Sequence, residues 1–316
     1  MQYRTLGRTG LRVSDVGFGA MTIGGEVFGG TDDAESLRAL HRALDLGMNF
    51  IDTADAYGRG HSEELIAQVL KTRRQEVILA TKGGNQYTVR QGVRNFDPDY
   101  ITSALEASLQ RLQIETIDLY QLHNPSPEVM QRGAIFERLE RFKREGKIRF
   151  YGVSLETTAD GLVAIQTGKP DTLQVVYNIF HQDPEAQLFP LAQKDNIGIL
   201  ARVPLERGLL SGRFKHTSEF AEKDARRGLF SDEDLTQIHA AVDKLNFLVK
   251  GDVPNLAQAA LRFILSHAAV SAVIPGIRTV RQVEENLKVS GKTLPAEDVT
   301  RLRALYRSEF CHLSFH

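Results

Sequence analysis

Apolar and polar residues follow two patterns along the chain. Short runs dense in Val, Ile and Leu predict buried strands, and longer runs with apolar residues every three or four positions predict amphipathic helices. The predicted strands are residues 16–20, 49–52, 77–82, 117–123, 148–154, 173–177, 197–201 and 270–274, and the predicted helices are 33–47, 62–70, 98–112, 128–145, 162–166, 187–194, 257–266 and 280–289.

Strands that alternate with helices predict an α/β fold with a parallel sheet, and a closed (β/α)8 TIM barrel accounts for the whole pattern. Two segments lie outside it: residues 4–13 predict an N-terminal β-hairpin, and residues 296–306 predict an extra C-terminal helix. Because no low-complexity linker divides the chain, we interpret residues 1–316 as a single barrel domain. An open doubly wound sheet is the alternative.

Signals at the element boundaries agree with this division. Asp33 and Ser62 are expected to cap helix starts, and Gly47 and Gly146 are expected to follow helix ends. The connection 202–269, between the seventh and eighth strands, is far longer than the others. A connection of that length usually has a function.

Composition narrows the functional classes. A net charge of −1 provides no basic field for nucleic acid or for an anionic membrane, so neither is expected as a partner. The single cysteine, Cys311, excludes an internal disulfide framework and fits a reducing compartment. Because the N-terminus lacks the apolar core of a signal peptide and no apolar run would span a bilayer, we expect a cytoplasmic protein.

Polar residues gather at the ends of the predicted strands. Asp52, Lys82, His123 and Ser154 each close a strand, and Gln174 begins another. Because the carboxyl ends of barrel strands meet on one face, these side chains are expected to converge. A lysine that closes an apolar strand needs an anionic partner, and Asp52 on the neighbouring strand is the expected one.

Tyr57, in the loop after Asp52, completes a group suited to proton donation. A free phenol titrates near pKa ~10, and a nearby ammonium favours the phenolate over the phenol. Lys82 would provide that ammonium, and His123 would either orient a carbonyl oxygen or share the proton. Together these groups predict general acid catalysis on a carbonyl.

Longer motifs carry a resemblance to a known family. FIDTADAYG at 50–58, TK at 81–82 and DLYQLH at 118–123 resemble the aldo-keto reductase superfamily. The similarity runs nearly end to end, from RTLG at 4–7 to IPG at 274–276 and EENL at 284–287. It implies a (β/α)8 barrel that reduces aldehydes or ketones with NADPH, with NADH less favoured. The catalytic residues implied are Tyr57 as the acid, Lys82 as its activator, Asp52 as the partner of Lys82, and His123 as the residue that positions the substrate.

The cofactor is not expected in a Rossmann site, because GFGAMT at 17–22 lacks the third glycine of that fingerprint. Loop 204–213 and the helix start after 275–279 provide phosphate-binding groups instead, and no metal site is expected. Residue pattern and resemblance together imply cofactor contacts by Gly19, Ala20, Met21, Asp52, Ser154, Gln174, Arg202, Pro204, Leu205, Gly208, Leu210, Gly212, Gly276, Arg278, Gln282, Glu285 and Asn286.

The chain departs from the family pattern in three places. Arg202 stands where many members have an aromatic residue that stacks on the nicotinamide, and Leu155 replaces an asparagine that often contacts the carboxamide. Gly276 and Gln282 stand where a lysine and an arginine commonly meet the 2′-phosphate. Arg278 is expected to compensate, because a guanidinium suits phosphate.

Two other functions fit parts of the pattern. A barrel aldolase would use Lys82 as a Schiff base, and a non-catalytic nucleotide-sensing subunit would bind the cofactor without turnover. The substrate is expected to lie among variable loops that include Phe28 and Tyr87, with Arg90 and Arg94 in a solvated basic loop.

Overall fold

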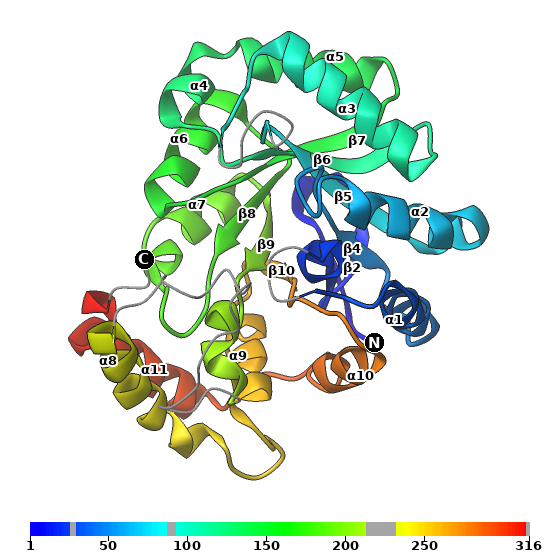
Figure 1. The fold of residues 1–316 in the computed structure, drawn as a ribbon. Coiled ribbons are helices and arrows are strands. Elements are labelled where there is room, and N and C mark those ends of the chain that lie inside the picture. Colours follow the sequence, from blue (N-terminus) through cyan, green and yellow to red (C-terminus); the bar gives the residue numbers. More distant parts are fainter. Residues whose placement is uncertain (26–29, 87–92, 213–231, 314–316) are drawn as a thin grey trace.

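The computed structural model describes residues 1–25, 30–86, 93–212 and 232–313, and its strands curl around a central axis with helices outside (Figure 1). Eight parallel strands of the described chain pair in the order β10-β9-β8-β7-β6-β5-β4-β3. They are β3 (Phe18–Gly19), β4 (Phe50–Asp52), β5 (Ile78–Gly83), β6 (Ile117–His123), β7 (Ile148–Ser154), β8 (Thr172–Val176), β9 (Gly198–Arg202) and β10 (Val270–Val273).

The two edge segments of this sheet meet and close it. Parallel bridges join Val16 to Val273 and Gly19 to Gly276, and the backbone N–H of Gly19 donates to the carbonyl of Pro275 at 3.0 Å. The prediction of a closed barrel is therefore confirmed, and the open doubly wound alternative is wrong.

Helices surround the barrel and follow its strands along the chain (Figure 1). No helix in the described ranges is long and apolar enough to cross a membrane. The helices are α1 (Asp33–Asp45), α2 (His61–Arg73), α3 (Pro98–Leu112), α4 (Pro127–Arg132), α5 (Ala134–Arg144), α6 (Thr158–Gly168), α7 (Leu188–Lys194), α8 (Asp232–Asp243), α9 (Leu256–Leu265), α10 (Val280–Leu287) and α11 (Ala296–Ser308).

Several local predictions need correction. The single helix expected over 128–145 is two helices, because Gly133 takes a left-handed conformation (φ 77°) between α4 and α5. Asp32, not Asp33, caps α1 by accepting from the backbone of Ala34. Ser62 lies inside α2, and its hydroxyl donates to the carbonyl of Ala20 at 3.0 Å.

The N-terminal hairpin, β1 (Tyr3–Thr5) paired with β2 (Arg12–Ser14), covers the amino end of the barrel. Its turn meets the start of β9, where the N–H of Arg8 donates to the carbonyl of Asn196. The buried side chains of this end form one apolar cluster: Leu6, Leu11, Val13, Phe50, Ala80, Leu119, Leu200, Ala272 and Ile274.

The interior becomes polar two residues further along the strands. Asp52 follows Phe50, Lys82 follows Ala80, and Gln121 follows Leu119 at this spacing. Alternate residues of a strand point to the same face, so these polar side chains share the interior with the apolar cluster. The hairpin therefore leaves the carboxyl end as the place where chemistry can occur.

Candidate active site

Lys82 is the centre of the polar layer. Its side chain has no exposed surface, and its ammonium donates to Asp52 Oδ1 at 2.6 Å, to the Thr53 carbonyl at 2.8 Å and to the Tyr57 hydroxyl at 3.1 Å. Three acceptors therefore satisfy the three protons of one ammonium.

Charge partners keep this ammonium protonated. Burial alone lowers the pKa of Lys82, but the carboxylate of Asp52 and then Tyr57 outweigh it, so the net direction is upward. At neutral pH, Lys82 is a cation held against the phenol of Tyr57.

Asp52 is held by amides as well as by Lys82. Its second oxygen, Oδ2, accepts from Gln174 Nε2 at 2.7 Å and from Gln121 Nε2 at 3.0 Å. The sequence predicts Gln174 at the start of a strand, but it lies in the middle of β8. Gln121 was not predicted at all, although its place two residues before His123 on β6 puts both on one face of the strand.

The loop that carries Tyr57 is fixed by backbone contacts. The N–H of Asp55 donates to the carbonyl of Lys82 at 3.1 Å, and the N–H of Tyr57 donates to that of Ala54 at 3.1 Å. Gly58 has a φ of 60°, and a Cβ there would lie 2.1 Å from the Gly24 oxygen. Any other residue at this position would displace the tyrosine.

His123 lies edge-on to Tyr57, with ring centroids 6.0 Å apart. The amide nitrogen of Asn85 lies 2.8 Å from His123 Nδ1 and can only donate, so Nδ1 accepts and the neutral ring carries its proton on Nε2. Burial and then the charge of Lys82 hold the pKa of His123 well below its ordinary value. The ring is therefore a neutral donor at physiological pH.

A cleft of about 860 Å³ opens beside Tyr57 and Asp52 and runs past the loop after β9 to α10. Thirteen of the expected cofactor contacts line it: Gly19, Met21, Asp52, Gln174, Arg202, Pro204, Leu205, Gly208, Gly276, Arg278, Gln282, Glu285 and Asn286. Four others do not line it: Ala20, Ser154, Leu210 and Gly212. Asn255 and Gln258 line it without having been predicted.

The backbone around this cleft is shaped for close contact. A Cβ at Gly19 would lie 2.6 Å from the Pro275 oxygen, so one wall is bare main chain. Val203 and Arg207 also line the cleft, and both take positive φ, 54° and 49°, which is rare for residues other than glycine. Strained backbone of this kind is often found in ligand clamps.

Two departures from the family pattern contact each other. The guanidinium of Arg202 donates through Nη2 to the carbonyl of Leu155 at 2.7 Å. The Nε of Arg202 is buried and has no hydrogen-bond partner among the described residues. Arg202 therefore brings an unused donor and a positive charge to the end of the cleft beside Tyr57.

Comparisons with known proteins agree with this geometry. The model of the Aldo/keto reductase family matches residues 15–307. The chain belongs to this family of oxidoreductases. Aldo-keto reductase YhdN of Bacillus subtilis is 34% identical over 307 residues, which cover 94% of this chain and 91% of that protein.

Two further relatives of this aldo/keto reductase extend the comparison. "Aldo-keto reductase yakc [NADP(+)]" of Schizosaccharomyces pombe is 33% identical over 284 residues, which cover 87% of this chain and 83% of that protein. The solved structure "aldo-keto reductase AKR11C1 from Bacillus halodurans (holo form)" superposes with a TM-score of 0.81 at 32% identity and covers 96% of each chain.

The aldo/keto reductase also buries the carboxyl of Asp55, on the outer side of the barrel wall. Asp55 is 1% exposed, and neither of its oxygens has a hydrogen-bond partner among the described residues. Beside it, Glu63 accepts from Thr81 at 2.6 Å and from Arg111 at 2.7 Å. Burial and then Glu63 raise the pKa of Asp55 to about 8.

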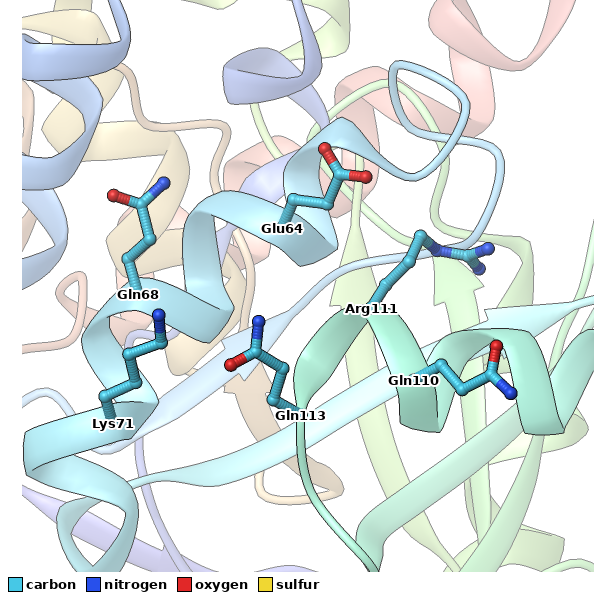
Figure 2. A pocket seen from close by; sticks show the side chains of 6 residues that line it. All are labelled: Glu64, Gln68, Lys71, Gln110, Arg111 and Gln113. Atoms are coloured by element: carbon cyan, nitrogen blue, oxygen red, sulfur yellow. The ribbon is translucent and has the colours of Figure 1, made fainter.

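Arg111 connects this buried group to the surface. A polar cavity of about 620 Å³ lies between α2 and α3, and Figure 2 shows the side chains around it. They are Glu64, Gln68 and Lys71 from α2, and Gln110, Arg111 and Gln113 from the end of α3. None of the expected cofactor contacts lines this cavity.

The expected substrate walls are described only in part. Phe28, Tyr87 and Arg90 lie outside the described residues. Arg94 is exposed, and it forms an ion pair with the exposed Glu156 and donates to the carbonyl of Asn124 at 3.2 Å.

Proposed function

We propose that this protein reduces an aldehyde or ketone to the alcohol with NADPH, and that Tyr57 is the general acid. The observation that carries the proposal is the 3.1 Å contact between the Tyr57 hydroxyl and the buried, charged ammonium of Lys82, at the edge of the large cleft. An ammonium in this position stabilises the phenolate that remains after the proton has been donated.

The cleft fits an NADP molecule in its donors and its charge. The Nε of Arg202 is a buried donor with no partner among the described residues, and the loop with Leu205 and Gly208 provides backbone for a pyrophosphate. Arg278 and Arg281 line the far end, where they would bind the 2′-phosphate, because guanidinium groups recognise phosphate well. The NADP(+) in the printed name of the S. pombe relative supports the same cofactor.

Each catalytic side chain has one task in this proposal. When bound, NADPH supplies the hydride to the carbonyl carbon. Tyr57 gives its proton to the carbonyl oxygen, and the Nε2–H of His123 donates to that oxygen and orients it. Asp52, fixed by Gln121 and Gln174, keeps Lys82 charged and in place throughout.

The direct test is Tyr57→Phe, which removes the proton and keeps the ring. We expect kcat for NADPH oxidation to fall by roughly 10³-fold or more across a panel of aldehydes, ketones, keto acids and sugars. The Kd for NADPH, measured by its fluorescence, should stay within about twofold of the wild type. Turnover close to the wild-type rate would remove Tyr57 as the acid.

The same geometry argues against an aldolase. A Schiff-base lysine must attack as a neutral amine, whereas Lys82 is held protonated by Asp52 and uses all three protons in hydrogen bonds. Borohydride treatment in the presence of a carbonyl substrate should therefore leave Lys82 unmodified. A nucleotide-sensing subunit without turnover would show NADPH binding but no oxidation with any carbonyl of the panel.

A further inference from the structure

Arg202 is the charged residue of β9 that faces the reactive end of the cleft. It ends β9 and lines the cleft together with Asp52, Tyr57 and Gln174. Tyr57 acts on the substrate carbonyl in the proposed function, so the hydride donor must lie at this end too. The lining residues Arg281, Gln282, Glu285 and Asn286 come from α10 instead.

The charge of Arg202 is not neutralised locally. No ion pair joins Arg202 to a carboxylate in the parts of the chain that the structure describes, and its guanidinium instead donates to the neutral carbonyl of Leu155. The carboxylates that act on Arg202 electrostatically, Glu156 and Asp52, are each paired with another cation. Glu156 pairs with Arg94, and Asp52 pairs with Lys82 at 2.6 Å.

Hydride transfer changes the charge of the group that lies at this end. The nicotinamide ring is neutral in NADPH and carries one positive charge in NADP⁺, while the rest of the molecule keeps its charge. A fixed cation in partly buried surroundings repels the oxidised ring and leaves the reduced ring unaffected. Arginine remains charged throughout the working pH range.

We propose that Arg202 makes the enzyme discriminate between the redox states of its cofactor, so that it binds NADPH more tightly than NADP⁺. This inference rests on the proposed function. The expected consequence is faster release of the oxidised cofactor, because NADP⁺ that binds weakly leaves sooner and NADPH replaces it. An aromatic residue at this position would act in the opposite sense, because the face of an aromatic ring attracts a cationic group and would favour the oxidised ring.

The test compares Arg202→Gln, which removes the charge, with Arg202→Lys, which keeps it. Kd values for NADPH and NADP⁺ are measured by titration calorimetry with the full-length protein. We expect the wild type to bind NADPH roughly tenfold or more tightly than NADP⁺. The ratio of the NADP⁺ Kd to the NADPH Kd should fall towards one in Arg202→Gln and be largely retained in Arg202→Lys.

The control ligand is 2′-phospho-ADP-ribose, which keeps the adenine and phosphates and lacks the nicotinamide. Its Kd should be the same in all three proteins, which also shows that the variants are folded. An unchanged NADPH preference in Arg202→Gln, or equal affinities in the wild type, would overturn the inference while leaving Tyr57 as the acid. Failure of the wild type to bind either cofactor would instead overturn the proposed function.

Discussion

Two buried carboxyls three positions apart lie on opposite sides of the barrel wall. Asp52, on the inner side, receives hydrogen bonds from Lys82, Gln121 and Gln174. Asp55, on the outer side against α2 and α3, receives none among the described residues and lies near the carboxylate of Glu63. The two carboxyls are almost equally buried, at 2% and 1% exposed, but hydrogen-bond donors surround only Asp52.

The difference in surroundings gives the two carboxyls different charges at neutral pH. Inside the barrel, donors surround a carboxylate, which can then hold an ammonium against Tyr57. Outside, burial and a like charge keep Asp55 protonated at neutral pH, because its pKa is raised to about 8. Burial alone therefore does not set the charge of a carboxyl; the hydrogen-bond donors and charges around it do.

Removing the inner cation should have the largest effect. Lys82→Met leaves Asp52 buried without its ion pair and removes the charge beside Tyr57. We expect kcat/KM for carbonyl reduction to fall by about 10³-fold or more, together with a lower Tm. Activity within tenfold of the wild type would show that the phenol does not depend on this ammonium.

The outer pair should matter for stability and not for chemistry. Arg111→Gln leaves the fully buried Glu63 without its cation, next to Asp55. The free energy of unfolding should fall by about 3 kcal/mol, measured in urea, since breaking a buried ion pair leaves a charge without compensation. Arg111 is 18% exposed, so solvent screening keeps the loss at the lower end of the usual range.

Gln110→Ala is the matched control, because Gln110 lies in the same polar cavity (Figure 2) but is exposed and outside the buried group. Its effect on stability should stay within about 0.5 kcal/mol. Equal losses in the Gln110 and Arg111 variants would show that the cavity surface, and not the ion pair, is what matters.

Asp55→Asn should act in the opposite direction and stabilise the protein. The folded pKa of Asp55, about 8, exceeds the ordinary 3.8, so between these values the folded state holds a proton that the unfolded state has lost. Stability therefore falls as pH rises through this window. The asparagine should remove that slope. At ~1.4 kcal/mol per pH unit, its gain in stability should be absent near pH 3, about 2 kcal/mol at pH 5.5, and larger still towards pH 8.

This prediction is checked by urea unfolding of both proteins at several pH values, with NADPH oxidation as the second readout. Turnover should be nearly unchanged, because the N–H of Asp55 that contacts the Lys82 carbonyl is kept in asparagine. A parallel pH dependence in both proteins would mean that Asp55 is ionised in the folded state.

The contacts on the inner side of the wall were predictable from sequence, because each residue's place along its strand fixes where its side chain lies. Asp52 and Lys82 stand at strand ends, and a barrel brings such ends together, so their pairing followed from the order of strands. Gln121 was missed although the two-residue period of β6 indicates it. The alternation of side chains along a strand shows which polar residues share a face. It does not show which residue of another strand will be their hydrogen-bond partner.

The outer side was not predictable in the same way. Asp55 lies in a loop, where no periodicity assigns a side chain to the barrel or to the helices. Its surroundings depend on how α2 and α3 pack, which brings Glu63 and Arg111 together from positions 48 apart in the chain. The cleft was predicted better, since its lining follows the strand ends and the turn before α10.

Tyr120→Phe should have the smallest effect and tests whether the outer group contains a hidden hydrogen bond. The Tyr120 hydroxyl is buried and has no partner among the described residues, and burial followed by the charge of Asp55 raises its pKa well above the ordinary value. Removing an unsatisfied hydroxyl should stabilise the protein by up to about 1 kcal/mol.

The double variant Asp55→Asn/Tyr120→Phe shows whether the two side chains interact. If no hydrogen bond links them, the two stability changes should add within about 0.5 kcal/mol in urea unfolding at pH 7. A loss of 2 kcal/mol in Tyr120→Phe that disappears in the Asp55→Asn background would instead mean that the protonated carboxyl and the phenol are bonded. In that case, the outer carboxyl would also be held by a partner, and the contrast with Asp52 would be one of protonation alone.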